Sequence, residues 1–205
     1  MTITTIMLSA AMLLGSCYTG STTGCPPEHE QSGLPVTEGI HQGFNYWAHI
    51  TGRDKVILDG DFLRLNRYDT DAERQTAVTL QLMAGGPVAV ADQPQTIGDN
   101  LQFYTNSELL ALRRDGFVGQ PLNDRLGQQH ETWYGAMSDG SYVVALFNRS
   151  DVQTTLTADF AQLGIKGRWQ VRDLWTHTDE GTGQTSVTAD VAAHGCKVVK
   201  LSRIR

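Results

Sequence analysis

The sequence lacks the excess of basic residues that a nucleic-acid-binding protein needs. Its 205 residues include 16 Lys and Arg against 22 Asp and Glu, which gives a formal net charge of −6. Binding to nucleic acid depends on a basic patch or stripe that neutralises phosphates. We therefore expect no nucleic-acid partner.

Long apolar segments are also absent. A helix that spans a bilayer needs about 18 or more consecutive apolar residues, and the longest apolar-leaning stretch covers only residues 6–15. We therefore expect no transmembrane span. The chain is 40% hydrophobic and 19% charged, which is ordinary for a globular protein.

Basic residues are missing from the N-terminal part in particular. Residues 1–16 are apolar or small, and Leu14-Gly15-Ser16-Cys17 resembles a bacterial lipoprotein cleavage site. This pattern indicates an export signal, and an exported bacterial protein would be secreted, periplasmic or bound to the cell surface. A signal peptide normally starts with positive charge, yet no Lys or Arg precedes Arg53. The alternative is a truncated gene start, and both interpretations stay open.

Cysteine is scarce and does not follow a metal-binding pattern. Cys17, Cys25 and Cys196 are an odd number without paired spacing. The first two can close a small disulfide in a secreted protein, and Cys196 lies in an apolar stretch typical of a buried strand. His41 and His49 have no carboxylate partner at metal-ligand spacing. We expect neither a metal site nor a cofactor.

The first 45 residues show little periodicity. They are rich in Gly, Ser, Thr and Pro, so we expect an irregular segment over residues 1–45. From residue 55 the pattern changes. Residues 56–58 form a short apolar run, typical of a strand buried on both faces, and the run ends at Asp59-Gly60-Asp61.

A helix is expected to follow this strand. Thr70 and Glu73 have the spacing of a capping box, Ala77 and Leu80 fall on one helical face, and Gly85 is a natural stop.

A second strand and a second helix come next. Residues 87–91 form another apolar run, which ends at Asp92, and either Asn106 or Ser107 is suited to cap a further helix. Residues 55–113 thus predict strand, helix, strand, helix, the signature of a parallel sheet covered by helices. In a β/α barrel the carboxyl ends of the strands carry the active site.

After Gly119 the pattern changes to short strands. Residues 131–137 and 141–147 flank an Asp-Gly turn and predict a hairpin. This spacing predicts an antiparallel β-sandwich over residues 119–205. Further strands are expected at residues 153–160, 168–174, 186–191 and 196–201.

Three tryptophans fall on or beside these predicted strands. Trp133, Trp169 and Trp175 are large apolar side chains that stabilise a core when buried. We expect them to form sandwich core rather than platforms for sugars.

The β/α part is too short for a complete barrel. A barrel needs about 250 residues, and residues 46–118 supply only about two of its eight units. Two parallel strands leave open edges and cannot bury both faces. The fold is either a smaller α/β arrangement or the last two β/α units of a (β/α)8 TIM barrel followed by a C-terminal antiparallel β-sandwich. We expect the second, with the preceding barrel units missing from the chain.

Several segments resemble glycoside hydrolase family 27, the α-galactosidase-like enzymes or melibiases. The family has an Asp-x-Asp-hydrophobic-Leu motif after barrel strand seven, a Pro that opens strand eight and an Asn-x-Glu motif beyond it. The matching segments of the barrel part are residues 55–63, 82–92 and 106–112, and those of the sandwich are residues 142–149, 171–175 and 193–198.

The resemblance implies retaining hydrolysis of α-glycosides. This chemistry uses two carboxylates about 5 Å apart, one as nucleophile and one as acid/base. In the family they come from strands four and six, and no matching motif precedes residue 50. We therefore predict that the catalytic aspartates are absent and that the chain alone does not hydrolyse glycosides. The expected partner of the parent enzyme is an oligo- or polysaccharide with α-linked galactose or a similar sugar.

The resemblance leaves one wall of a sugar pocket in this chain. Asp61 matches the aspartate of the strand-seven motif, where it would bond sugar hydroxyls or neighbouring catalytic groups, with capping of a local turn as an equal alternative. Phe62 stands where the family usually has a pocket-lining methionine. Trp47 is a candidate stacking platform, with packing in a loop as the alternative. Asp59 is a second candidate ligand, although capping of a local turn accounts for it better. Asp92 is interpreted as structural.

Two further functions stay open. One is a non-catalytic module in which the β-sandwich binds carbohydrate or supports another domain, and the other is a small α/β protein of unrelated function. The resemblance leaves three activities for the parent enzyme, which we rank as α-galactosidase, then α-N-acetylgalactosaminidase, then isomalto-dextranase.

Overall fold

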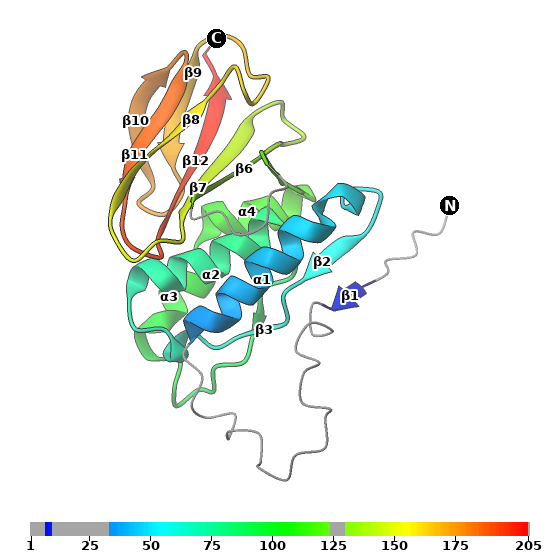
Figure 1. Cartoon of the computed structure of the whole chain (residues 1–205), viewed down its shortest axis with the longest axis vertical. Coiled ribbons are helices and arrows are strands. Elements are labelled where there is room, and N and C mark those ends of the chain that lie inside the picture. The colour runs from blue at the N-terminus through cyan, green and yellow to red at the C-terminus, as the bar shows by residue number, and fades with distance from the viewer. Residues whose placement is uncertain (1–6, 10–32, 124–129, 205) are drawn as a thin grey trace.

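A computed structural model describes residues 7–9, 33–123 and 130–204 of the chain (Figure 1). The cleavage-site pattern at residues 14–17 and the possible disulfide between Cys17 and Cys25 lie outside the described residues. Among the described residues, no helix is both long and apolar enough to cross a membrane.

The C-terminal part is the predicted antiparallel β-sandwich. One sheet has the strand order β10-β9-β12-β7-β6-β5, and the strands β11 and β8 form the other. The hairpin around Gly140 pairs Ala136 with Tyr142. The strands are β5 (Gln120–Pro121), β6 (His130–Ala136), β7 (Tyr142–Asn148), β8 (Thr154–Asp159), β9 (Trp169–Asp173), β10 (Thr178–Gly183), β11 (Ser186–Val191) and β12 (Cys196–Arg203).

The larger sheet is buried on both faces. Successive side chains of a strand point to opposite faces, so β7 contributes to two cores: Val143 and Phe147 pack toward the helices, while Val144 and Leu146 pack toward β8 and β11. The strand is therefore a continuous apolar run rather than an alternation of apolar and polar residues.

The tryptophans confirm the expected core. Trp133 is 1% exposed and packs on the helical side of the large sheet, whereas Trp169 is 2% exposed and packs between the two sheets. Trp175 is partly buried, and its indole nitrogen donates a hydrogen bond to Thr79. Cys196 also packs on the helical side, where burial raises the pKa of its thiol to about 11.

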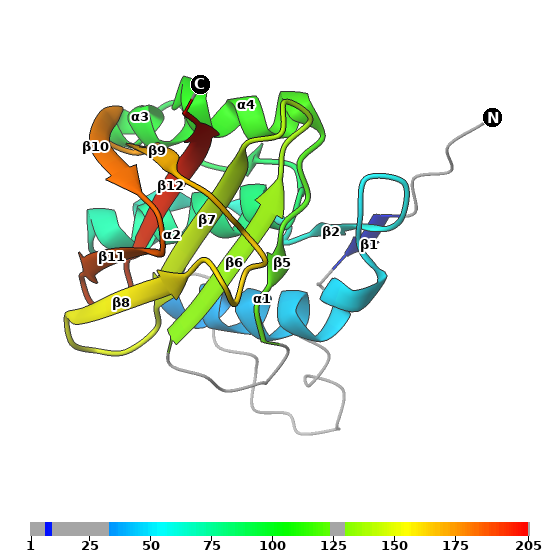
Figure 2. The ribbon, with the colours of Figure 1, turned by 90° about the horizontal axis from the view of Figure 1, so that it is seen from above.

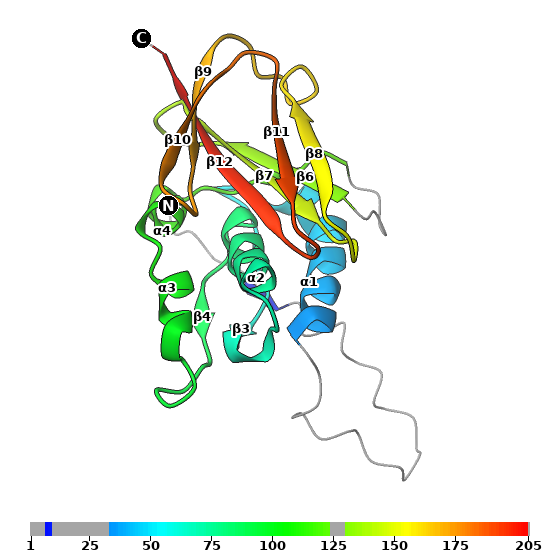
Figure 3. The ribbon, with the colours of Figure 1, turned by 90° about the vertical axis from the view of Figure 1, so that its left-hand side faces the viewer.

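A layer of helices covers the large sheet. Figure 2 shows β7 and β12 crossing over α2, and Figure 3 shows α2 beneath the sandwich, with α1 on one side of it and α3 on the other. The helices are α1 (Gly33–Trp47), η2 (Ala48–Ile50), η3 (Leu65–Arg67), α2 (Asp71–Met83), η4 (Gly98–Asn100), α3 (Leu101–Tyr104) and α4 (Ser107–Asp115).

The helix α1 corrects one prediction. Residues 1–45 were expected to be irregular, but from Gly33 onward the chain is helical. The buried face of α1 is largely polar, because Thr37, His41 and Asn45 lie four residues apart and are each at most 3% exposed. A prediction from apolar periodicity does not mark these three polar residues as a buried face.

The predicted caps of α2 and α4 are confirmed. Thr70 and Glu73 form a reciprocal capping box at the start of α2, with a distance of 3.2 Å from the Glu73 N–H to the Thr70 hydroxyl. The Asn106 side chain accepts hydrogen bonds from two N–H groups of α4. Gly116, with φ of 68°, ends that helix in the left-handed conformation that glycine favours.

The strands of the β/α part form two parallel pairs. β1 (Met7–Ser9) pairs with β2 (Ile57–Asp59), and β3 (Phe62–Leu63) pairs with β4 (Ala89–Val90). The predicted order of strand, helix, strand, helix is confirmed. The expectation that residues 87–91 are buried on both faces is wrong, because β4 has only two residues and Val90 is 44% exposed.

Candidate functional site

The candidate site lies where β2 ends and β3 begins. Leu58 fixes the end of β2 in the core, since it is only 3% exposed. The next residue, Asp59, accepts a hydrogen bond of 2.9 Å from the backbone N–H of Asp61. This contact agrees with turn capping by Asp59, as its position in the sequence suggested.

Gly60 is required by a close approach to α2. Its N–H donates a hydrogen bond of 3.0 Å to the side-chain oxygen of Gln81. A Cβ at this position would come within 2.1 Å of the Gln81 amide nitrogen. Because Gln81 is fully buried, it cannot swing away, and only glycine fits between the two aspartates.

Asp61 adopts an unusual backbone conformation. Its φ is 66°, in the left-handed region that only a few per cent of non-glycine residues occupy. One carboxylate oxygen accepts a hydrogen bond of 2.8 Å from the N–H of Phe62. Asp61 is exposed, and among the described residues nothing binds its second oxygen. The turn therefore presents an exposed carboxylate at the end of a strand, and its left-handed backbone is a basis for a functional hypothesis.

An aromatic side chain stands next to this carboxylate. Phe62 is 67% exposed although its neighbour Leu63 is 2% exposed, because β3 turns alternate residues to opposite faces. Phe62 pairs with Ala89, and Leu63 pairs with Val90, so the two exposed side chains, Phe62 and Val90, lie on opposite faces of this strand pair. A carboxylate beside an exposed ring can bond the hydroxyls of a sugar and cover its apolar face.

Asp92 has a structural position, in agreement with its interpretation. Its carboxylate accepts hydrogen bonds from the N–H of Leu65 at 2.9 Å and from the Tyr104 hydroxyl at 2.8 Å. Burial, followed by the hydrogen bond to Asp92, raises the pKa of Tyr104, so that the hydroxyl stays protonated. These contacts tie the end of β4 to the end of β3.

Trp47 lies apart from the other candidates. It ends α1, and the chain then enters β2 at its N-terminal end, whereas Asp59, Asp61 and Phe62 follow its C-terminal end. Trp47 contacts the rings of Tyr46 and His49 and packs against the core. Among the described residues no hydrogen bond or ring contact joins it to the candidate site. The structure brings three of the four candidates together and leaves Trp47 out.

A buried ion cluster joins α1 to the sandwich, and sequence spacing alone did not predict it. The Nδ1 atom of His41 lies 3.2 Å from the Glu131 carboxylate, which also accepts a hydrogen bond from Trp133. Arg149 bridges Glu131 at 2.5 Å and Glu38 at 2.9 Å. Burial raises the pKa of Glu131, but His41 and Arg149 outweigh this effect, so the pKa is lowered overall. The residues of this cluster are spread over residues 38–149, and a pattern of neighbouring residues cannot reveal contacts over such a separation.

No metal centre is found in the described ranges, where no three His, Cys, Asp or Glu side chains gather closely enough to hold an ion.

Comparisons with known proteins agree with this architecture. Residues 127–201 match the family of the α-galactosidase C-terminal β-sandwich domain. The isomalto-dextranase of Arthrobacter globiformis is 44% identical over 170 residues, which are 78% of this chain and 26% of that protein. The α-galactosidase of Cyamopsis tetragonoloba is 27% identical over 148 residues, which are 70% of this chain and 36% of that protein.

Solved structures show the same likeness. The isomalto-dextranase of Arthrobacter globiformis T6 in complex with panose superposes with a TM-score of 0.71 and 39% identity, covering 80% of this chain and 29% of that one. A family 27 β-L-arabinopyranosidase from Geobacillus stearothermophilus superposes with a TM-score of 0.76 at 22% identity, covering 84% and 43%. The chain thus spans between a quarter and a half of each of these relatives. It corresponds to the C-terminal part of an α-galactosidase-like enzyme of glycoside hydrolase family 27.

Proposed function

We propose that this chain supplies one wall of the sugar pocket of a retaining glycoside hydrolase. The observation that carries the proposal is the strained turn at Asp61, which presents a free carboxylate oxygen beside the exposed ring of Phe62. A left-handed aspartate costs free energy, about 1–3 kcal/mol for a residue in such a region. A role of Asp61 in binding substrate would explain why the protein keeps this costly backbone conformation.

The substrate class that we propose is an α-linked glucan of the dextran type. The identity of 44% to an isomalto-dextranase exceeds the 27% to a plant α-galactosidase. This difference reverses the ranking drawn from the sequence motifs, which put α-galactosidase first. Phe62, which replaces the methionine usual in the family, is the residue that we expect to favour this substrate.

The chain is not proposed to catalyse hydrolysis by itself. A retaining enzyme needs a pair of carboxylates about 5 Å apart across the bond that is cleaved. β1 pairs in parallel with β2. The residues of β1 are Met, Leu and Ser, and no Asp or Glu occurs in the sequence before Glu28.

We further propose that residues 46–118, preceded by α1, form the end of a β/α barrel and that residues 119–205 form its C-terminal sandwich. A polymeric substrate would place the protein outside the cytoplasm, in agreement with the export pattern of its first residues.

A hybrid enzyme tests the proposed wall. The 170-residue segment of the Arthrobacter globiformis isomalto-dextranase that aligns with this chain is replaced by the segment from this chain, and kcat/KM on dextran is measured. Asp61→Asn is expected to lower kcat/KM by about tenfold to a hundredfold, because a hydrogen bond to a charged group contributes about 1.5–3 kcal/mol.

Asp151→Asn is the matched control, since the Asp151 side chain is 94% exposed and lies in the sandwich. It makes the same change of charge and is expected to leave kcat/KM unchanged. Equal activity of the Asp61→Asn hybrid and the parent hybrid would remove the basis of the proposal.

A further inference from the structure

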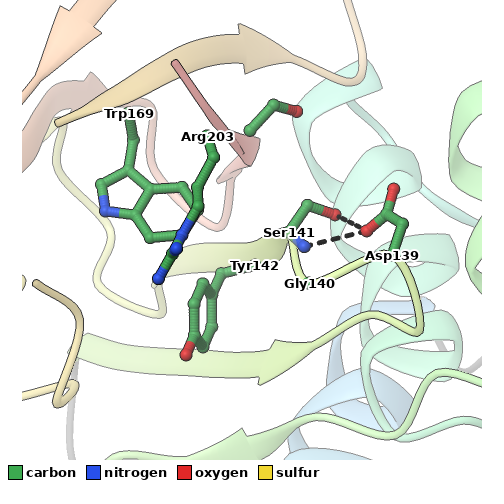
Figure 4. A pocket seen from close by; sticks show the side chains of 7 residues that line it. Asp139, Gly140, Ser141, Tyr142, Trp169 and Arg203 are labelled. Carbon is green, nitrogen blue, oxygen red and sulfur yellow. Dashed lines mark hydrogen bonds between the residues drawn. The ribbon is translucent and has the colours of Figure 1, made fainter. Parts of the chain in front are cut away.

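A second candidate site lies at one end of the sandwich. A hollow of about 520 Å³ is bordered by the turn between β6 and β7 and by the ends of β9 and β12 (Figure 4). The turn contributes Asp139 and Ser141, and the strands contribute Tyr142, Trp169 and Arg203. Strand pairing fixes these positions, because Arg203 lies directly opposite Trp169. The volume lies within the range of small-molecule sites, about 300–1,000 Å³.

One wall of the hollow is aromatic. The Tyr142 ring meets the Trp169 ring edge to face, with centroids 5.4 Å apart at an angle of 85°. The Arg203 guanidinium lies 5.5 Å from the centroid of the Trp169 ring. Trp169 is almost fully buried, so it supports the other two side chains rather than contacting solvent. Tyr142 is half-buried and Arg203 is exposed, and these two side chains are accessible to a ligand.

The facing wall is polar and rigid. Asp139 accepts hydrogen bonds from the N–H of Ser141 at 2.9 Å and from the ammonium of Lys200 at 2.9 Å. The Ser141 hydroxyl, also bonded to this carboxylate, and then Lys200 lower the pKa of Asp139 to about 2, so the carboxylate is ionised at neutral pH. A fixed carboxylate offers its remaining lone pairs as an acceptor for hydroxyl groups.

Several donors around the hollow have no hydrogen-bond partner among the described residues. They are the Tyr142 and Ser202 hydroxyls and the Arg203 guanidinium. The indole N–H of Trp169 also has no partner among the described residues, but it is buried in the core between the two sheets. A buried donor without a partner is rare in native proteins and calls for a water or a ligand. The hollow therefore combines free donors, one fixed acceptor and an aromatic surface.

This combination selects the class of ligand. A simple anion would make no use of the aromatic wall, and a purely apolar ligand would leave the polar wall without partners. A sugar ring has hydroxyls that both donate and accept, and one apolar face that suits an aromatic side chain. We propose that the hollow between Asp139, Tyr142 and Arg203 binds one sugar ring of an α-linked saccharide.

This site is separate from the wall at Asp61. Figure 1 shows the end of β12, which carries Arg203, on the far side of the helices from β3. Its role goes beyond the proposed active-site wall, because a second contact with a polymer chain raises the effective concentration of substrate near the enzyme.

The test is a titration of the full chain with isomaltotriose, followed by nuclear magnetic resonance of the indole N–H groups. The Trp169 resonance is assigned with Trp169→Phe. We expect millimolar binding that shifts this resonance. Arg203→Met is expected to weaken binding about tenfold or more, the factor for losing a hydrogen bond from a charged group. Tyr142→Ala is expected to weaken binding as well.

Two further variants separate this site from the proposed active-site wall. Tyr46→Ala removes an aromatic ring that is 56% exposed on α1, and it is expected to leave binding unchanged. Phe62→Ala is also expected to leave the Trp169 shift unchanged. Absence of binding, or binding that Arg203→Met does not weaken, overturns the inference. Binding that is lost with Phe62→Ala alone also overturns it, while supporting the wall at Asp61. Arg203 is exposed, so its variant is expected to fold even where Tyr142→Ala does not.

Discussion

At the scale of single residues, Glu131 is the centre of the contact between α1 and the sandwich. It is 6% exposed and interacts with His41, Arg149 and Trp133. Replacement of one member of such a cluster leaves the others buried without a partner, which costs more than an exposed ion pair contributes. The cluster therefore fixes the position of α1 against β6 and β7.

The first prediction concerns Glu131→Gln. We expect the free energy of unfolding at neutral pH to fall by roughly 3 kcal/mol, because Arg149 and His41 lose a buried carboxylate. Urea denaturation measures the change. Glu180→Gln is the control, since Glu180 is an exposed partner of Lys197 and its removal is expected to cost at most about 1 kcal/mol. Equal losses in the two variants would mean that the cluster contributes little.

The second prediction concerns how the difference in unfolding free energy between the parent chain and Glu131→Gln depends on pH. Because the pKa of Glu131 is lowered on folding from its ordinary 4.5, its charge stabilises the fold above about pH 4.5. This contribution is lost as the pH falls through the lower pKa of the folded state. The gap in stability between the parent chain and Glu131→Gln should therefore narrow as the pH falls below about 4.5. A gap that widens toward acid pH would contradict the assignment.

At the scale of elements, sequence patterns succeeded where apolar periodicity and caps coincide. The helix α2 has both, and its capping box at Thr70 and Glu73 is present as predicted. The sandwich strands β6, β7, β8, β9, β11 and β12 also follow their apolar patterns.

Several elements were missed, and α1 and β10 are the longest of them. The helix α1 buries polar side chains, as described above, and the strand β10 is formed by Thr178–Gly183, which contains no apolar side chain. β10 is held by backbone pairing with β9, with an irregular register between Asp179 and Thr182. Backbone hydrogen bonds to a neighbouring strand do not depend on side-chain identity, so no local pattern indicates this strand.

The candidate site was predictable only in part. Asp59, Asp61 and Phe62 were predicted as site residues because they follow an apolar run and because they match a motif of family 27. The left-handed conformation of Asp61 and the approach of Gln81 to Gly60 depend on the packing of α2, and Gln81 lies 21 residues after Gly60 in the chain. The position of Trp47 likewise depends on the direction of α1.

The third prediction concerns the cap of α2. Thr70→Ala removes the hydroxyl that accepts the Glu73 N–H, and it is expected to lower the free energy of unfolding by about 1 kcal/mol. Thr155→Ala is the control, because Thr155 is an exposed strand residue whose hydroxyl bonds only the exposed Asp190 side chain. Thermal unfolding followed by circular dichroism compares the two. A smaller loss in Thr70→Ala than in the control would contradict the role of the cap.

At the scale of the whole molecule, the helices and the large sheet share one core. Trp133 and Phe147 of the sheet pack together with Leu80 and Leu109 of the helices. The sandwich thus has an apolar face that the β/α part covers, in contrast to a free-standing module whose outer faces are polar. This arrangement favours the enzyme-part interpretation over the alternative of an independent carbohydrate-binding module.

The fourth prediction follows from this shared core. Residues 119–204 produced alone are expected to unfold at lower temperature than residues 33–204, and to bind a dye that reports exposed apolar surface. The physical reason is that Trp133, Val143, Phe147 and Val198, each at most 1% exposed in the structure, would lose their cover. Cooperative unfolding of both chains at the same temperature would show that the sandwich is independent.

The central claim is that this chain contributes substrate contacts to a glycosidase but not its catalytic carboxylates. The most direct measurement is the release of reducing sugar from dextran by the purified chain and by the hybrid with the isomalto-dextranase barrel. We expect that the folded chain alone releases none and that the hybrid is active. Hydrolysis by the chain alone that is lost with Asp61→Asn, or a folded hybrid without activity, would contradict it.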